Sequence, residues 1–209
     1  EALVLCGIPW AKEVFRQIDS NLQIHWQAAD GAELPAQSLL ATLKGSARSL
    51  VTAERTALNF LQTLSGTATL AHSYAKRVKS FKVKLLDTRK TIPGLRHAQK
   101  YAVVCGGLEN HRFGLYDAIL IKENHIAAAG SVAEALRRAR ELKTQAPIEI
   151  EVETLEQFSQ ALENGATRIL LDNFSLEAIR TAVREAKGRA TLEVSGGVNL
   201  ENLRDLAQT

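Results

Sequence analysis

The sequence predicts an α/β protein whose larger part is built on a parallel sheet. From residue 83 onward, short apolar runs alternate with amphipathic helical patterns, which is typical of repeated strand-helix units. Each apolar run ends abruptly in charged or small polar residues. A long helical pattern separates this repeat from a smaller α/β segment at the start of the sequence. We prefer a barrel for the larger part, and a doubly wound sheet is the alternative.

Composition places the chain among ordinary globular proteins. Its 209 residues are 45% hydrophobic and carry a formal net charge of +3, which allows one large or two smaller domains. No apolar run reaches the roughly 18 residues that span a bilayer, and no signal segment opens the sequence. Cys6 and Cys105 match no metal-ligand spacing and predict buried free thiols. We therefore expect a cytoplasmic protein without a membrane partner. The sequence contains no methionine and ends inside a helical pattern, so we also expect it to be truncated at both ends.

The net charge conceals an asymmetry between two parts of the sequence. Residues 76–112 hold ten Lys and Arg against two acids, whereas residues 149–205 hold eleven acids against six bases. Aromatic residues that could stack on bases are sparse in the basic part. We interpret its cations as a solvated face and predict no nucleic-acid partner.

The first 78 residues predict a small α/β unit followed by a long helix. Apolar patterns predict strands at 3–6, 22–26 and 38–43 and a helix at 9–18. Thr52 is the predicted N-cap of the long helix, which would bridge two domains. Arg55 then falls in its first turn, where the helix dipole favours acids, so Arg55 needs either solvent or another anion.

The repeat that follows predicts five strands and five helices. The strands are expected at 83–86, 118–121, 148–152, 169–171 and 192–194. The helices are expected at 95–105, 132–142, 155–162, 176–186 and 200–206. Because right-handed crossovers place the C-terminal ends of parallel strands at one edge, we expect the polar residues after all five strands to converge.

Those strand ends carry groups suited to a polyanion beside carboxylates. Guanidinium groups pair with carboxylate or phosphate in bidentate fashion, lysines act as point charges, and a glycine pair exposes backbone amides near a helix start. Carboxylates hold either Mg²⁺ or sugar hydroxyls. The residues concerned are Arg89, Lys90, Arg112, Lys122, Glu151, Asp172, Ser195, Gly196 and Gly197.

Several motifs, in order, closely resemble quinolinate phosphoribosyltransferases. They include Asp87-Thr88-Arg89-Lys90-Thr91-Ile92-Pro93-Gly94-Leu95-Arg96, Asn110-His111-Arg112, Lys122-Glu123-Asn124-His125, Leu171-Asp172-Asn173 and Glu193-Val194-Ser195-Gly196-Gly197. The resemblance covers nearly the whole chain. It implies a small N-terminal α/β sandwich and an incomplete parallel α/β barrel. Residues 1–52 would belong to the sandwich and 53–80 to a bridging helix, with the truncated barrel at 81–209.

The resemblance also implies a reaction and a set of roles. The family converts quinolinate and phosphoribosyl pyrophosphate into nicotinate mononucleotide, pyrophosphate and CO₂, uses Mg²⁺, and usually forms dimers or higher oligomers. Thr88, Arg89, Lys90, His111 and Arg112 would bind the pyridine dicarboxylate, with Arg55 contributed across the interface of a homodimer. Lys122 would face pyrophosphate or a substrate carboxylate. Glu151 and Asp172 would hold ribose hydroxyls or magnesium, and Ser195, Gly196 and Gly197 the 5′-phosphate. Lys122, Glu151 and Asp172 are the expected catalytic residues.

Three alternatives remain open from the sequence. A Schiff-base lyase on the same barrel would use Lys122 as nucleophile, but a neutral lysine is disfavoured beside an acid. A related phosphoribosyltransferase would act on another heterocycle. A non-catalytic paralogue would bind a phosphometabolite without turnover.

Overall fold

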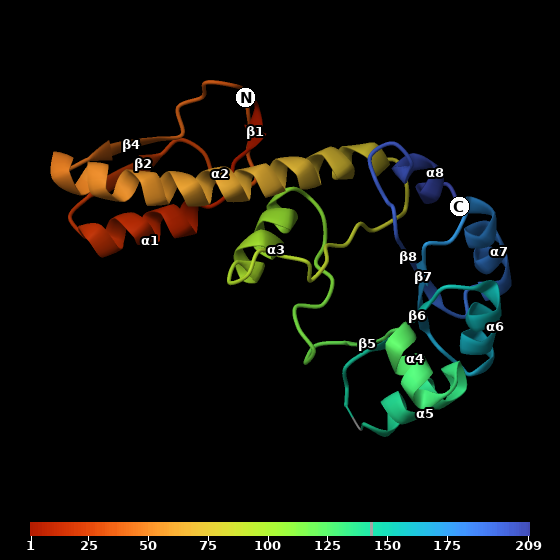
Figure 1. The fold of residues 1–209 in the computed structure, drawn as a ribbon. Coiled ribbons are helices and arrows are strands. Elements are labelled where there is room, and N and C mark those ends of the chain that lie inside the picture. Colours follow the sequence, from red (N-terminus) through yellow and green to blue (C-terminus); the bar gives the residue numbers. More distant parts are fainter. Residues whose placement is uncertain (143) are drawn as a thin grey trace. The chain divides into compact units, whose positions relative to one another are not determined.

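The computed structural model describes residues 1–142 and 144–209, and its contacts divide the chain into two compact units. The first unit is Glu1–His111 and the second is Arg112–Thr209. In Figure 1 the first unit is coloured from red to green and the second from green to blue. None of the described helices is long and apolar enough to cross a membrane.

The first unit begins with one helix and two antiparallel strand pairs. These elements are β1 (Leu3–Val4), α1 (Ile8–Ile18), β2 (Gln23–Trp26), β3 (Glu33–Leu34) and β4 (Ala41–Lys44). β1 pairs with β3, and β2 pairs with β4. The predicted alternation is confirmed in β2, where Ile24 and Trp26 are half-buried and His25 is exposed.

A 32-residue helix, α2 (Ala47–Val78), runs through the first unit. Its N-cap is Ser46, so the predicted N-cap at Thr52 is wrong. Thr52 lies inside the helix, where its hydroxyl donates a hydrogen bond of 2.8 Å to the carbonyl of Arg48. Arg55 is consequently in the third turn, beyond the reach of the helix dipole. The helix dipole therefore does not disfavour a cation at this position. The predicted need of Arg55 for solvent or an anion, which rested on a place in the first turn, does not hold.

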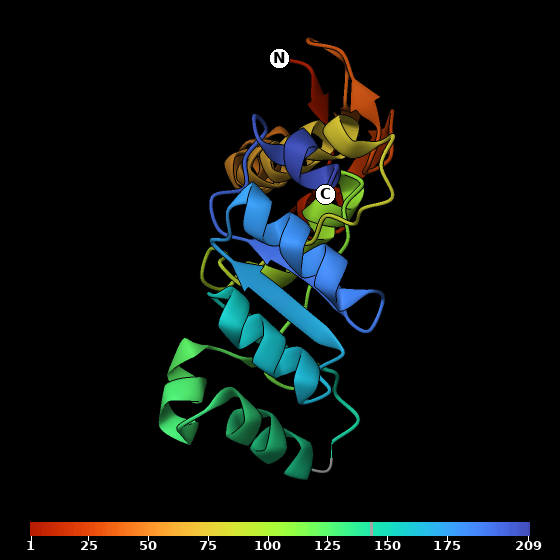
Figure 2. The same cartoon turned by 90° about the vertical axis from the view of Figure 1, so that its right-hand side faces the viewer.

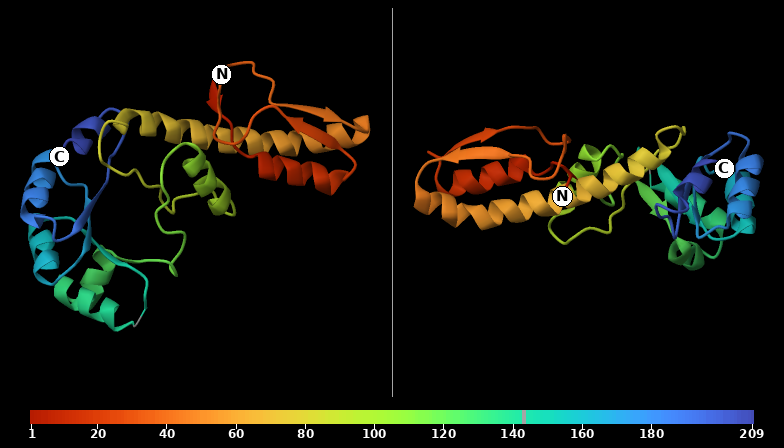
Figure 3. Two further views of the ribbon diagram at one scale, coloured as in Figure 1. Left: turned by 180° about the vertical axis from the view of Figure 1, so that it is seen from behind. Right: turned by 90° about the horizontal axis from the view of Figure 1, so that it is seen from above.

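The length of α2 is explained by a continuous apolar stripe. Its buried positions recur every three or four residues and include Ala53, Ala57, Leu61, Leu64, Ala68 and Ala71. α1 lies alongside the N-terminal half of this stripe (Figure 3) and buries Ala11 and Phe15 against it. The helix continues through Ser65 and Gly66, and the Ser65 hydroxyl exchanges hydrogen bonds with the backbone of Cys6.

The predicted strand at residues 83–86 is wrong. The segment forms only one parallel bridge, between Leu86 and Glu109. Glu109, the partner of Leu86 in this bridge, follows α3 (Arg96–Cys105). α3 packs on α2. Gly106 allows this approach, because a Cβ there would lie 2.4 Å from the carbonyl oxygen of Ala68.

The second unit confirms the predicted parallel sheet. Its strands, in spatial order, are β5 (Ile119–Ile121), β6 (Ile148–Val152), β7 (Arg168–Asp172) and β8 (Thr191–Ser195). Its helices are α4 (Glu123–Ala129), α5 (Val132–Glu141), α6 (Leu155–Glu163), α7 (Leu176–Ala186) and α8 (Leu203–Ala207). The sequence pattern did not predict α4. The alternation of strands and helices confirms the predicted α/β class.

One face of this sheet is apolar and the other is polar. Alternate residues of β6 and β7, among them Ile150, Val152, Ile169 and Leu171, are buried against α5, α6 and α7. Figure 2 shows the helices of this unit, cyan to blue, lying along one side of the strands. Because side chains alternate across a strand, the intervening positions face the other side. Two predicted site residues, Glu151 on β6 and Asp172 on β7, occupy such positions.

The three helices that cover the sheet begin in the same way. Ser131, Thr154 and Ser175 are the N-caps, and each side chain accepts a hydrogen bond from the backbone N–H three residues later. An acid lies in each first turn, where the helix dipole favours negative charge. These caps fix where each strand ends and its helix begins.

Candidate active site

Asp87 is the centre of a buried polar cluster in the first unit. Its carboxylate forms an ion pair with the ammonium group of Lys100, and the two side chains are 7% and 1% exposed. The same carboxylate accepts hydrogen bonds from the Asn110 side chain at 2.6 Å and from the His111 backbone N–H at 2.8 Å. Lys100 also donates to the carbonyl of His111 at 2.8 Å. The cluster therefore ties the loop after residue 86 to the segment that ends in His111.

The cluster leaves the neighbouring cations of the loop without a carboxylate partner. Asp87, the only acid in the motif, is committed to Lys100. Among the described residues, Arg89 and Lys90 form no ion pair, and the buried Nε of Arg89 has no hydrogen-bond partner. A buried guanidinium donor without a partner is costly, which favours an anionic ligand at this position.

The backbone around these cations is fixed by short-range hydrogen bonds. The Thr88 hydroxyl accepts from the Lys90 N–H at 3.0 Å, and the Thr91 N–H donates to the carbonyl of Arg89 at 3.0 Å. Gly94 has a φ of 77°, which ends the turn before α3. Thr88 thus shapes the loop in this structure through its side-chain oxygen.

Arg112 begins the second unit, and its position is set by the strand that follows. Its guanidinium donates a hydrogen bond of 3.0 Å to the carbonyl of Ala118, next to β5. The carboxylate of Asp117 accepts from the backbone N–H groups of Phe113 and Gly114 at 2.7 and 3.0 Å. These contacts hold the turn between Arg112 and β5.

Lys122 and Glu151 meet at the C-terminal edge of the sheet. Lys122 follows β5, and its ammonium lies 3.0 and 2.8 Å from the two carboxylate oxygens of Glu151 in β6. Lys122 is 44% exposed, whereas Glu151 is 10% exposed. The cation is therefore held in place by a buried acid and is still accessible to a second anion.

Asp172 and Ser195 meet at the same edge, on the two neighbouring strands β7 and β8. The Ser195 hydroxyl donates to Asp172 Oδ1 at 2.8 Å, and the Asn173 side chain donates to Oδ2 at 2.8 Å. Asn173 has a φ of 57°, and its N–H donates to the Ser195 carbonyl at 3.0 Å. Gly196, with a φ of 86°, is required beside it, because a Cβ there would lie 2.8 Å from the Asn173 nitrogen.

The glycine pair after β8 does not lie at a helix start as the sequence suggested. α8 begins at Leu203 and has five residues, so Gly196 and Gly197 belong to a loop. That loop is held by Asn202, whose side chain donates to the Gly197 carbonyl at 2.9 Å. Gly197 has a φ of 64° and open space around its Cβ position. The backbone amides of Gly196 and Gly197 are still available to an anion, but no helix dipole strengthens the interaction.

Sequence reasoning missed several residues that support these groups. Lys100 was not singled out from the sequence, and its complete burial was not foreseen. Glu149 was also missed: it is 3% exposed on the polar face of β6, and one of its carboxylate oxygens lies 4.0 Å from the guanidinium of Arg168 on β7. The alternation of Ile and Glu in 148–152 was the signal for an acidic face behind the strand ends.

Glu151 and Asp172 supply the carboxylate oxygens that Mg²⁺ prefers. Both oxygens of Glu151 lie against the ammonium of Lys122, which repels a divalent cation. The oxygens of Asp172 accept from neutral donors and have lone pairs left. The donor set therefore fits a magnesium ion that also contacts substrate phosphates, with Asp172 better suited than Glu151.

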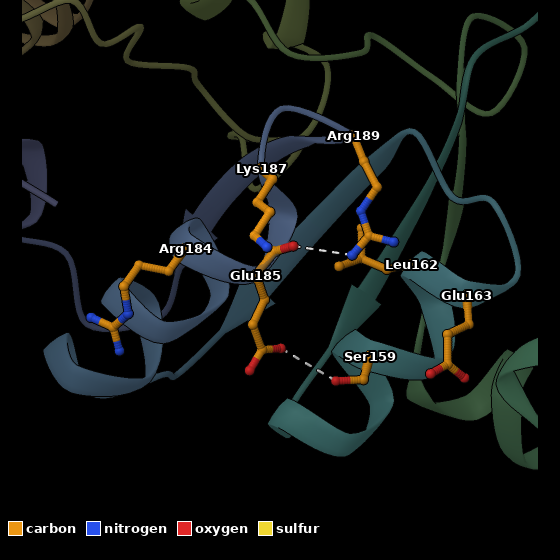
Figure 4. Close-up of a pocket in the computed structure, with 7 residues that line it drawn as sticks. All are labelled: Ser159, Leu162, Glu163, Arg184, Glu185, Lys187 and Arg189. Carbon is orange, nitrogen blue, oxygen red and sulfur yellow. Dashed lines mark hydrogen bonds between the residues drawn. The ribbon is translucent and has the colours of Figure 1, made fainter.

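A surface pocket of the second unit lies away from these groups. It is formed where α6 and α7 end, which is the edge of the sheet opposite the Lys122–Glu151 pair. Its lining residues are Ser159, Leu162, Glu163, Arg184, Glu185, Lys187 and Arg189 (Figure 4). The Ser159 hydroxyl and the carboxylate of Glu185 face one another at 3.4 Å. This shallow, mixed-charge pocket contains none of the predicted site residues.

Comparisons with known proteins match both units of the chain to one family. Residues 1–65 match the N-terminal domain of quinolinate phosphoribosyl transferase, and residues 67–209 match its C-terminal domain. Nicotinate-nucleotide pyrophosphorylase [carboxylating] from Mycobacterium leprae is 46% identical over 211 residues, which cover 99% of this chain and 74% of that protein. A probable enzyme of the same name from Synechocystis is 39% identical and is covered to 71%.

Solved structures agree with the sequence matches. The nicotinate-nucleotide pyrophosphorylase from Francisella tularensis is 50% identical, with a TM-score of 0.96 over all of this chain and 74% of that one. The protein of the same name from Ehrlichia chaffeensis is 40% identical, with a TM-score of 0.95 over all of this chain and 76% of that one. The chain therefore belongs to the quinolinate phosphoribosyltransferase family.

Proposed function

We propose that this chain transfers the phosphoribosyl group of phosphoribosyl pyrophosphate to quinolinate, with decarboxylation, in the biosynthesis of NAD. The products are nicotinate mononucleotide, pyrophosphate and CO₂. The observation that carries this proposal is the match of both family domains along the chain, together with relatives named for the reaction at 39–46% identity. The chain is accordingly a glycosyltransferase of the phosphoribosyltransferase class.

We assign the phosphoribosyl group to the C-terminal edge of the sheet in the second unit. Asp172 and Glu151 are placed to accept hydrogen bonds from the ribose hydroxyls, since carboxylates accept such bonds strongly. The backbone amides of Ser195, Gly196 and Gly197 suit the 5′-phosphate because they are unobstructed by side chains. Support comes from the hydrogen bond between Ser195 and Asp172, which fixes the carboxylate beside the glycine loop.

We assign the pyridine dicarboxylate to the cations of residues 88–90 and 111–112, as the family resemblance implies. Arg89 and Arg112 suit bidentate pairing with a carboxylate, and Lys90 and His111 add charge and hydrogen bonds. Thr88 fixes the backbone conformation between them. Support comes from the burial of the Arg89 Nε without a hydrogen-bond partner among the described residues.

Lys122 is the proposed catalytic cation for the departure of pyrophosphate. As the bond to the ribose breaks, negative charge grows on the leaving group and positive charge on the ribose. The half-exposed ammonium of Lys122 neutralises the former, and the carboxylates of Glu151 and Asp172 stabilise the latter. Asp172 would hold Mg²⁺ together with the substrate phosphates, and the ion would neutralise further charge on the leaving group. The same carboxylates also stabilise the positive charge of the pyridinium ring, from which CO₂ is lost.

The test of this function uses the purified protein with quinolinate and phosphoribosyl pyrophosphate. We expect CO₂ and pyrophosphate to be released one for one, and nicotinate to be a poor substrate because it has only one carboxylate for the cations. Equal turnover of nicotinate contradicts the specificity. Reduction with borohydride in the presence of substrate tests the lyase alternative, because a covalent adduct forms only if Lys122 makes an imine.

We further propose that the protein is a homodimer in which Arg55 acts in the partner's site. Support comes from the surface of α2, where Arg55 is exposed and has no ion-pair or hydrogen-bond partner among the described residues. Val51, one turn earlier, is 72% exposed, so this face of the helix presents apolar area as well as charge. Both features suit a contact between subunits.

Mixed dimers test the assignment of Arg55. If Arg55 acts across the interface, Arg55→Ala and Lys122→Ala homodimers are both nearly inactive, whereas a mixed dimer has one intact site. Random reassociation of equal amounts makes about half of all dimers mixed, so activity returns to about one quarter of wild type. No return of activity contradicts a shared site. An active Arg55→Ala homodimer shows instead that Arg55 is a surface charge.

A further inference from the structure

A second cluster of ligand-type side chains lies in the first unit, among residues to which the proposed reaction assigns no role. It consists of Cys6, Asp30 and Cys105, whose sulfur and carboxylate oxygen atoms all lie within 4.8 Å of one another. The three residues come from the segment after β1, the turn between β2 and β3, and the last turn of α3. They are 24 or more positions apart in the sequence, so the spacing gave no sign of a site.

We propose that Cys6, Cys105 and Asp30 bind one divalent transition-metal ion of intermediate softness, with Zn²⁺ as the best match. Zinc takes thiolates at about 2.3 Å and carboxylate oxygens at about 2.0–2.2 Å in tetrahedral geometry. Tetrahedral ligand atoms at those lengths are about 3.4–3.8 Å apart. The ligand atoms observed within 4.8 Å of one another can reach this spacing with side-chain movements of an ångström or less.

The carboxylate of the cluster is already oriented by hydrogen bonds. Asp30 Oδ1 accepts from the backbone N–H of Ile8, and Oδ2 accepts from the Tyr101 hydroxyl at 3.0 Å. Tyr101 lies one turn before Cys105 on α3, so the same helix face supplies one ligand and the group that orients another. Outer hydrogen bonds of this kind commonly fix the ligands of metal sites.

The surroundings fix one sulfur ligand and leave the other accessible. Cys6 is fully buried, and its backbone is held by Ser65 from α2. Cys105 is only half-buried, which leaves an entry path on one side.

Metal content of the purified protein tests the proposal directly. We expect one zinc ion per chain after exposure to Zn²⁺ and removal of excess, and a thiolate-to-cobalt charge-transfer band after substitution with Co²⁺. Cys105→Ser should abolish both signals. Tyr101→Phe should weaken zinc affinity by about 10–100-fold, as expected for loss of an orienting hydrogen bond. His25→Ala, which removes an exposed histidine elsewhere in the unit, is the control and should bind zinc normally.

The melting temperature provides a second, independent measurement. Zinc should raise the melting temperature of the parent protein, because an ion that binds only the folded state stabilises it, and should not do so in Cys105→Ser. Zinc retained by Cys105→Ser overturns the proposal. So does a Cys6–Cys105 disulfide, detected by counting free thiols in the denatured protein without reductant, or the absence of stoichiometric zinc in the reduced parent.

Discussion

Two ion pairs, one in each unit, differ in exposure, and this difference separates a structural role from a chemical one. Lys100 and Asp87 in the first unit are 1% and 7% exposed, and three further hydrogen bonds surround them. Lys122 and Glu151 in the second unit are 44% and 10% exposed, with only the acid buried. The first lysine cannot reach a ligand. The second can exchange or share its partner with one.

The physical basis of this difference is desolvation. A buried ammonium that loses its carboxylate has no water to replace it, so Lys100 must keep Asp87. A half-exposed ammonium is hydrated on its open side, so a second anion can displace that water without breaking the pair with Glu151. The comparison therefore predicts that substitutions of the two lysines have opposite signatures in stability and in turnover.

The largest expected effect is on the buried pair. Lys100→Met should lower the free energy of unfolding by about 3–5 kcal/mol, because it leaves the Asp87 carboxylate buried without its counter-charge. Urea unfolding followed by circular dichroism measures this change. The control is Lys84→Met, which removes an exposed pair with Glu109 in the same unit and should cost about 0–1 kcal/mol. Equal losses in the two variants contradict the structural role of Lys100.

The next effect is on turnover. Lys122→Ala should lower kcat roughly a hundredfold or more, as expected for a group that neutralises charge in the transition state. Its free energy of unfolding should fall by less than in Lys100→Met, since the Lys122 ammonium is half-exposed and water can replace it beside Glu151. Arg184→Ala, at the opposite edge of the same unit, should leave kcat unchanged. A Lys122→Ala variant that is inactive only because it unfolds argues against the catalytic assignment.

A smaller effect is expected at the glycine loop that follows β8. Gly196→Ala places a Cβ 2.8 Å from the Asn173 nitrogen at a φ of 86°, and should cost about 1–3 kcal/mol of stability through backbone strain and raise the KM for phosphoribosyl pyrophosphate. Gly197→Ala has a positive φ but open space, and should cost about 1 kcal/mol. Equal losses of stability in the two variants would mean that the positive φ alone causes the loss and that the contact with Asn173 adds nothing.

The smallest effect belongs to a partly exposed ion-pair group at the surface of α5. Hydrogen bonds from Arg137 and Arg138 lower the pKa of Glu134 from 4.5 to about 2. A depressed carboxylate pKa stabilises the fold above pH 4.5, and this contribution is lost as the pH falls toward 2. Glu134→Gln should therefore lower the melting temperature slightly at pH 7 and not at pH 2. A difference that persists at pH 2 shows that the effect is not electrostatic.

The sequence determined the elements whose patterns are local. The β6 strand and α7 occur at their predicted residues, because alternating apolar residues predict a strand with one buried face and an apolar stripe predicts a helix. The strand ends of the second unit followed from the same logic, since parallel strands that alternate with helices share one C-terminal edge. Their charged residues could therefore be placed before any coordinates were known.

Tertiary structure decided what local patterns leave open. The segment at 83–86 has an apolar pattern but pairs at a single bridge, because a strand also needs a partner along its length. The start of α2 moved from residue 53 to Ala47, since packing against α1 extends a helix beyond its most obvious cap. Distant contacts also paired Asp87 with Lys100 and brought Cys6 to Cys105. No sequence spacing encodes such contacts, because they depend on which faces of separate elements meet.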